Sequence, residues 1–177
     1  MNNRILTNNL RTIPNFPKEG IMFRDVTSWF ENPLCVTELR RQLVDKFRTE
    51  YVDKVVCIES RGFVAGSILA ERLKAGIVLA RKPGKLPTDT VLATYEKEYG
   101  TDTIEMRVGS IKEGDVVIIH DDLLATGGTA MAVYTLVQMF KPSKVIFSFL
   151  IEISDEGLHG RGLLESTGCE VHSILKV

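Results

Sequence analysis

Two adjacent carboxylates stand between an apolar run and a glycine-rich turn in the segment 116–129, VVIIHDDLLATGGT. The apolar run before Asp121 and Asp122 predicts a buried strand, and the residues after the turn predict a helix. Paired glycines let a backbone close around an anion without Cβ clashes, and the free N–H groups at the start of a helix bind phosphate. The turn is therefore predicted to bind a phosphate monoester, and it consists of Ala125, Thr126, Gly127, Gly128 and Thr129.

A carboxylate pair beside an anion pocket needs sugar hydroxyls, a metal ion, or both as partners. A ribose that carries a 5-phosphate meets this need, with its 2- and 3-hydroxyls on Asp121 and Asp122. The pattern has neither the lysine of GxxxxGK[ST] nor the spacing of GxGxxG, which argues against an ATP-type P-loop and a dinucleotide fingerprint. An ordinary strand–turn–helix with capping acids is the alternative, but one acid would be enough for a cap.

Further charged residues follow two other predicted strands. Glu59, Ser60 and Arg61 come directly after the apolar run Lys54–Ile58. Because ligands of open parallel sheets bind at the carboxyl ends of the strands, Arg61 is placed to hold a pyrophosphate bidentately. A surface arginine that starts a helix is the alternative reading of that position. A second basic group, which on its own fits a solvated loop, follows the strand Ile77–Ala80 and consists of Arg81, Lys82 and Lys85.

Strands and helices alternate along the chain. Apolar runs rich in β-branched residues predict strands at Lys54–Ile58, Ile77–Ala80, Asp115–Ile119, Lys144–Ile151 and Val171–Leu175. Apolar residues at helical spacing predict helices at 33–47, Phe63–Leu73 and Gly127–Phe140. This order predicts an α/β fold with one parallel, twisted sheet that is covered by helices on both faces.

Two stretches do not fit the alternation. Thr12–Phe30 holds two prolines and a possible short strand, Ile21–Phe23, and is predicted to be a small cap, or hood, on the sheet. Lys82–Thr101 holds two prolines and two glycines. Such a long, weakly patterned connection is usually functional, and it is predicted to be a mobile lid. The whole chain, 1–177, is predicted to be a single domain, with 12–30 as its cap and 82–101 as its lid.

Composition excludes several classes of protein. A net charge of −1 argues against a nucleic-acid binder, which is expected to be basic. Three cysteines and three histidines are scattered without metal-ligand spacing, so neither a zinc site nor a disulfide framework follows. No signal-peptide core or membrane-spanning run is present. These features predict a soluble, cytoplasmic protein without a membrane partner.

The segment IIHDDLLATGGTA resembles the motif with which type I phosphoribosyltransferases bind 5-phosphoribosyl-1-pyrophosphate (PRPP). Four further stretches resemble the adenine-specific family in order and spacing: IPNFPKEGIMFRDVT at 13–27, IESRGFVAG at 58–66, RKPGKLP at 81–87 and YEKEYG at 95–100. The resemblance covers nearly the whole chain. It is weaker at His120, where the family usually has an apolar residue, and after Ser154.

The resemblance implies a reaction in which adenine and PRPP give AMP and pyrophosphate. It implies catalytic roles for Glu98, Tyr99 and Arg61, and a homodimer. It implies Mg²⁺ carried by PRPP or pyrophosphate near Asp121 and Asp122, rather than a metal held by the protein alone. Pyrophosphate contacts are implied for Glu59, Ser60, Arg61, Arg81, Lys82 and Lys85, with a cis peptide bond at Glu59-Ser60. Adenine contacts are implied for Met22, Phe23, Arg24 and Leu123.

Two alternatives share the same fold. One is a phosphoribosyltransferase for another base, such as hypoxanthine, guanine, xanthine or orotate. The other is a regulator that senses PRPP without catalysis, although such proteins usually add a DNA-binding domain and a basic surface. The EYG triplet and the cationic loop favour an enzyme.

Overall fold

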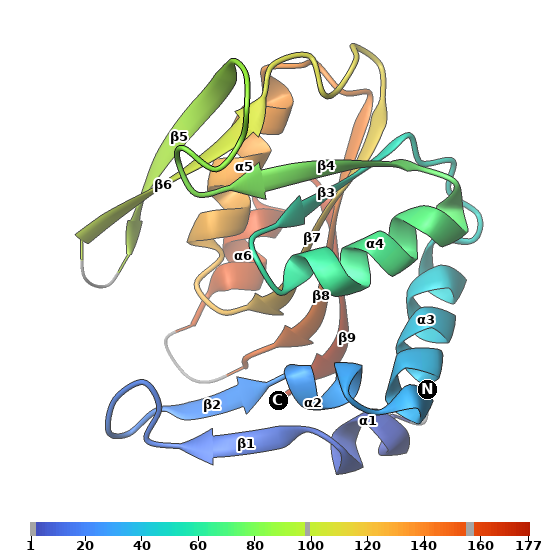
Figure 1. Ribbon diagram of the computed structural model, residues 1–177, viewed down its shortest axis with the longest axis vertical. Coiled ribbons are helices and arrows are strands. Elements are labelled where there is room, and N and C mark those ends of the chain that lie inside the picture. The colour runs from blue at the N-terminus through green and yellow to red at the C-terminus, as the bar shows by residue number, and fades with distance from the viewer. Residues whose placement is uncertain (1–2, 98–99, 155–157) are drawn as a thin grey trace.

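The computed structural model describes residues 3–97, 100–154 and 158–177. A seven-stranded sheet lies at its centre, with a separate two-stranded hairpin beside both chain ends (Figure 1). Across the large sheet the strand order is β5 (Thr90–Lys97), β6 (Gly100–Arg107), β4 (Gly76–Arg81), β3 (Lys54–Ile58), β7 (Val116–Leu124), β8 (Lys144–Glu152) and β9 (Glu170–Lys176). The helices are α1 (Arg4–Asn8), α2 (Thr27–Phe30), α3 (Pro33–Phe47), α4 (Gly62–Leu73), α5 (Gly128–Gln138) and α6 (Gly160–Glu165).

The central strands are buried on both faces. Strands β4, β3, β7, β8 and β9 run parallel to their neighbours in that order. On β3, Val55 packs in the cluster that α3 and α4 form with the sheet, whereas Val56 packs in the cluster on the α5 side. The predicted α/β fold, with helices on both faces, is therefore confirmed. The apolar runs in the sequence predicted these strands correctly, because a strand that is buried on both faces is apolar throughout.

One edge of the sheet differs from the wholly parallel prediction. Strands β5 and β6 form an antiparallel hairpin, and β6 pairs antiparallel with β4. Half of the stretch 82–101, which was expected to be a weakly patterned mobile lid, is therefore strand. Its side chains alternate: Val91, Ala93 and Tyr95 pack on the core, whereas Leu92 is exposed. A period of two is the signature of a strand with one buried face, and here it outweighs the prolines and glycines nearby.

The hood is an antiparallel hairpin of β1 (Arg11–Pro14) and β2 (Met22–Asp25). Strand β2 falls where a short strand was expected, and β1 is its partner. The hairpin is tied to α2 by Asp25, which accepts hydrogen bonds from the Thr27 N–H and hydroxyl and pairs with Arg11. Behind it, the buried Trp29 donates to the Leu6 carbonyl over 2.8 Å. Within the described residues, no helix has both the length and the apolar character that a membrane crossing requires.

Candidate active site

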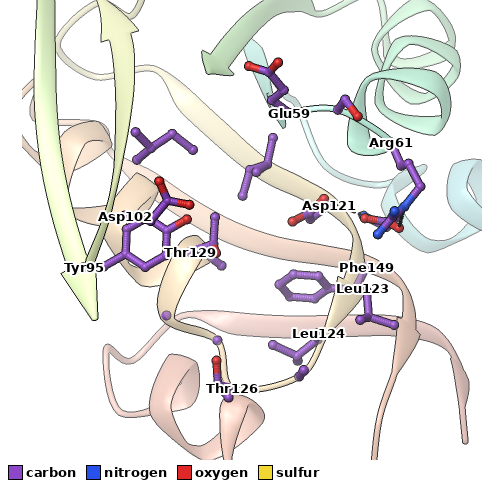
Figure 2. Close-up of a pocket in the computed structure, with 18 of the residues that line it drawn as sticks. Glu59, Arg61, Tyr95, Asp102, Asp121, Leu123, Leu124, Thr126, Thr129 and Phe149 are labelled. Carbon is purple, nitrogen blue, oxygen red and sulfur yellow. Dashed lines mark hydrogen bonds and ion pairs between the residues drawn. The ribbon is translucent and has the colours of Figure 1, made fainter. Parts of the chain in front are cut away.

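A cleft of about 500 Å³ opens at the carboxyl ends of β3, β7 and β8. The glycine-rich turn after β7 forms one wall, and the loop Glu59–Arg61, which leads into α4, forms another (Figure 2). The cleft thus lies at the edge of the sheet where parallel α/β folds bind their ligands. Its wall includes many of the residues that the sequence predicted: Glu59, Ser60, Arg61, Lys82, Asp121, Asp122, Leu123, Ala125, Thr126, Gly127, Gly128 and Thr129.

The turn has the backbone geometry of an anion site. Gly127 caps the amino end of α5 with φ of 80°, a left-handed conformation that favours glycine. Helix α5 begins at Gly128, so its first N–H groups have no partner within the helix, and Gly128, Thr129 and Ala130, which carry them, line the cleft. The positive end of the helix dipole lies at the same place and favours an anion there. The turn therefore has both the donors and the field that a phosphate requires.

The two carboxylates lie inside β7, which runs five residues beyond its predicted end at Ile119. Asp122 is buried and accepts a hydrogen bond from Arg61, with 2.5 Å between Nε and Oδ2. Burial and the neighbouring charge of Asp122 raise the pKa of the Asp121 carboxyl well above its usual value. Gly62 allows the close approach of α4, because a Cβ there would lie 3.0 Å from Asp121 Oδ1. The first residue of α4 thus packs directly on Asp121.

The basic residues after β4 are arranged differently from one another. Arg81 is held by Glu59 through two contacts of 3.2 Å, and it also donates to the Lys85 carbonyl. Of the three cations predicted from this stretch, Lys82 lines the cleft, whereas Arg81 and Lys85 are absent from its wall. The three residues were predicted as one group, and the structure separates them. The reason is the ion pair with Glu59, which turns Arg81 toward β3.

A buried carboxylate holds the basic loop in place. Glu105 on β6 is 4% exposed and accepts from the N–H groups of Lys85 and Leu86 and from the Thr90 hydroxyl. Burial alone would raise its pKa, but these donors bring the pKa below its usual value. An ionised Glu105 therefore anchors the loop between β4 and β5. The sequence gave no signal for this, because the pattern around Glu105 is that of a strand.

The hairpin β5–β6 adds residues to the cleft that sequence reasoning missed. Tyr95 on β5 and Asp102 on β6 are register partners and face the cleft from the side opposite Arg61 (Figure 2). Phe149 on β8 lines the cleft together with Leu123. A period-two pattern in 90–97 would have placed Tyr95 on an inward-facing position. Glu98 and Tyr99, the predicted catalytic pair, lie outside the described residues.

The hood reaches the site through an aromatic contact. The Arg61 guanidinium lies 5.6 Å from the centre of the Phe23 ring, which also meets Phe16 edge to face at 5.1 Å. Met22 is 53% exposed, and the Arg24 side chain donates to the Thr12 hydroxyl. The structure thus brings Phe23 to Arg61. Met22, Phe23 and Arg24 are not part of the cleft wall.

His120 lies beneath the site rather than in it. Its ring is fully buried, with Nδ1 3.1 Å from the Ser148 hydroxyl, while Nε2 has no hydrogen-bond partner among the described residues. Burial lowers its pKa to about 4, so the imidazole is neutral at physiological pH. The peptide bond between Glu59 and Ser60 is cis, as the family resemblance implied.

The fold and the cleft together are those of a type I phosphoribosyltransferase, and the relatives agree. The phosphoribosyl transferase domain family matches residues 25–169. The chain is 52% identical over 161 residues to adenine phosphoribosyltransferase of Phocaeicola vulgatus, and the match covers 91% of each chain. The crystal structure of adenine phosphoribosyltransferase from Rhodothermus marinus has a TM-score of 0.90 at 44% identity, covering 98% of this chain and 97% of that one. The chain therefore belongs to the phosphoribosyltransferase family.

Within that family it belongs with the adenine phosphoribosyltransferases, which form AMP from adenine and PRPP in purine salvage. The enzyme of Saccharomyces cerevisiae, solved with adenine and D-2,5-dideoxy-2,5-imino-altritol 1,6-bisphosphate, matches with a TM-score of 0.88 at 39% identity over 97% of both chains. These matches favour the adenine-specific enzyme over the alternatives of another base and of a regulator.

Proposed function

We propose that the cleft binds PRPP with its 5-phosphate in the turn Ala125–Thr129 and its ribose hydroxyls on Asp121 and Asp122. The observation that carries this assignment is the meeting of a helix start, two carboxylates and Arg61 in one cleft of about 500 Å³. A phosphate and a diol have complementary partners there, in the order in which they occur in a ribose 5-phosphate. The C1 atom then points away from the turn, toward Arg61 and Lys82.

The pyrophosphate end of PRPP is proposed to bind Ser60, Arg61 and Lys82. Arg81 and Lys85 are proposed to supply positive charge from outside the cleft wall. Glu59 holds Arg81 there through its ion pair. Charge develops on pyrophosphate as its bond to C1 breaks, and fixed cations stabilise that charge. Arg61 is released from Asp122, or shared with it, when the pyrophosphate arrives.

Mg²⁺ is proposed to enter the site with PRPP. In the residues that the structure describes, no three His, Cys, Asp or Glu side chains gather as a protein-made metal site would. Mg²⁺ is commonly held by one or two carboxylates together with substrate phosphates. Asp121 and Asp122 fit that arrangement, and when bound the ion would neutralise charge on the leaving pyrophosphate.

Adenine is proposed to lie between Leu123 and Phe23, with its edge read by the backbone of β2. Leu123 already lines the cleft, and Phe23 contacts Arg61 at its rim. Met22 and Arg24 are two residues apart on β2, so the Met22 carbonyl and the Arg24 N–H point to the same side of the strand. That carbonyl can therefore accept a hydrogen bond from adenine N6, while the Arg24 N–H donates to N1.

Glu98 is proposed to take or share a proton on the imidazole ring of adenine, which makes N9 nucleophilic. As pyrophosphate departs, the ribose becomes oxocarbenium-like and water could attack C1. Closure of the segment 82–101 would exclude that water, and Tyr99 is proposed to act as a residue of this lid. Tyr95 and Asp102 stand on the described part of the same hairpin and already form one wall of the cleft.

The proposed assembly is a homodimer, and the proposed location is the cytoplasm. On β4, Ile77 is 48% and Leu79 is 37% exposed, whereas Val78 and Ala80 between and beyond them are buried. A central strand with one apolar face open to solvent is suited to a subunit contact.

A nucleotide-formation assay tests the proposed function. The protein is mixed with PRPP, Mg²⁺ and adenine, hypoxanthine or guanine, and kcat/KM is measured for each base. Hypoxanthine would place its carbonyl against the Met22 carbonyl and its N1–H against the Arg24 N–H, so both hydrogen bonds would be lost. The kcat/KM for adenine is therefore expected to be higher by roughly 10⁴-fold. A preference below about tenfold would overturn backbone reading of the base, and absence of any nucleotide would overturn the enzyme.

A further inference from the structure

The back of the phosphate turn rests on a single glycine of the carboxyl-terminal region. The Gly160 N–H donates to the Ala125 carbonyl over 3.2 Å. A Cβ on Gly160 would lie 2.2 Å from Ala125 O and 2.9 Å from Gly127 N, and both are backbone atoms. A Cβ on Gly127 would in turn lie 3.0 Å from Gly160 O. The first residue of α6 and the turn are therefore in backbone-to-backbone contact.

Helix α6 is itself fixed by a partly buried ion pair. Arg161 donates to both carboxylate oxygens of Glu152, over 2.7 Å from Nε and 2.5 Å from Nη2, and its Nη1 donates to the Val171 carbonyl over 2.8 Å. Glu152 is 6% exposed and also accepts from the Ser173 hydroxyl. Burial would raise the pKa of Glu152, but Arg161 and Ser173 hold it at about 2, so the carboxylate stays ionised.

The carboxyl end of β8 is connected both to α6 and to the phosphate turn. Glu152 is the last residue of β8, and the next residue, Ile153, donates its N–H to the Leu124 carbonyl at the end of β7. The turn that follows Leu124 is thus held at its front by β7 and at its back by α6. Phosphate recognition through several backbone N–H groups requires those groups to converge on one point, and a displacement of about 1 Å can cost about 10²-fold in rate.

We infer that Gly160 and Arg161 are positioning residues for the phosphate-binding turn: Arg161 clamps α6 to Glu152, and Gly160 presses the turn into the shape that binds the 5-phosphate. This inference rests on the proposed function, in which that turn holds the 5-phosphate of PRPP. It gives a role to the carboxyl-terminal region, where the family resemblance is weakest. Neither residue touches the substrate, so neither is catalytic.

Gly160→Ala is the direct test, with Gly162→Ala as its matched control. Both glycines lie in α6, but a Cβ on Gly162 would meet nothing within 4 Å. Gly160 is outside the left-handed region, so the effect of a side chain there is steric. Gly160→Ala is expected to raise the KM for PRPP and the Kd for ribose 5-phosphate by at least tenfold. The Kd for pyrophosphate should change less than twofold, and Gly162→Ala should match the wild type throughout.

Arg161→Lys is the second variant, because it keeps the charge but loses the two-pronged contact with Glu152. It is expected to raise the KM for PRPP by threefold to tenfold, and to leave kcat at saturating PRPP within twofold. If both variants bind ribose 5-phosphate as the wild type does, the inference is wrong although the proposed function stands. If the wild type itself does not bind ribose 5-phosphate, the proposed function fails first. A uniform loss of all ligands in both variants would indicate a general folding defect and would also overturn the inference.

Discussion

Arg61 and Asp122 are 61 positions apart in the sequence, yet Arg61 Nε lies 2.5 Å from Asp122 Oδ2. The same guanidinium lies over the ring of Phe23 in the hood. One side chain therefore links the loop after β3, the carboxylate pair on β7 and the hood. Because Arg61 contacts all three parts, a substitution of Arg61 is expected to disturb each of them.

Arg61→Lys is expected to lower kcat/KM for PRPP by about 10²-fold. Lysine keeps the charge but lacks the planar fork that can hold Asp122 and a pyrophosphate oxygen together. Arg41→Lys is the control, because Arg41 also makes ion pairs, with Glu38 and Asp45, but on an exposed face of α3. Steady-state kinetics with varied PRPP measures the effect. A kcat/KM within threefold of the wild type would show that Arg61 does not hold the pyrophosphate of PRPP.

Glu98→Ala is expected to lower kcat by about 10²–10⁴, the usual contribution of a positioned acid–base group, while the affinity for PRPP hardly changes. Glu98 lies outside the described residues, so this prediction rests on the EYG triplet. The control is Glu113→Ala, since Glu113 is an exposed acid whose ion-pair partner is Lys141. Single-turnover measurement of AMP formation separates chemistry from binding. A near-normal kcat would assign the proton transfer to another group.

The buried His120 makes stability depend on pH. Its folded-state pKa of about 4 lies below the usual 6.5, so the unfolded chain binds a proton first as the pH falls. Stability is therefore full above pH 6.5 and declines as the pH falls from 6.5 to 4, by about 3 kcal/mol in all at about 1.36 kcal/mol per pH unit. Replacing the pair by His120→Val with Ser148→Ala should make the decline between pH 7.5 and 5 smaller by about 2 kcal/mol.

Urea unfolding at one protein concentration measures that difference. His159→Gln serves as the control, because His159 is exposed and precedes α6. The double variant avoids leaving either polar group of the pair buried without a partner. An unchanged pH dependence in the double variant would show that His120 is protonated alike in the folded and unfolded chain.

Ile77→Glu is expected to weaken the proposed homodimer. A charge placed in an apolar contact should raise the dissociation constant by tenfold or more, equivalent to about 1.4 kcal/mol. Met139→Glu is the control, because Met139 is 59% exposed at the end of α5, on the other side of the sheet. Sedimentation equilibrium gives the constants. Equal effects of the two substitutions, or a monomeric wild type, would exclude β4 from the contact.

The sequence by itself determined the elements and the central motif. Strands β3, β8 and β9 and helices α3 and α4 fall within a residue or two of their predicted bounds, because burial of both strand faces or of one helix stripe leaves a local pattern. The turn after β7 was equally legible, since Gly127 is needed where φ is positive. The family resemblance added the residue roles, which the local patterns do not contain.

Only the tertiary structure decided which distant groups meet. Arg81 pairs with Glu59 and leaves Lys82 in the cleft wall, a choice that depends on β3 and β4 being neighbours. Gly160 supports the turn because α6 returns to β7 after the end of β8, and its sequence neighbourhood shows an ordinary glycine. Such contacts join residues far apart in the chain, and their energies depend on packing and register rather than on local conformation. A pattern that is read a few residues at a time therefore locates the phosphate turn but not the parts that hold it in shape.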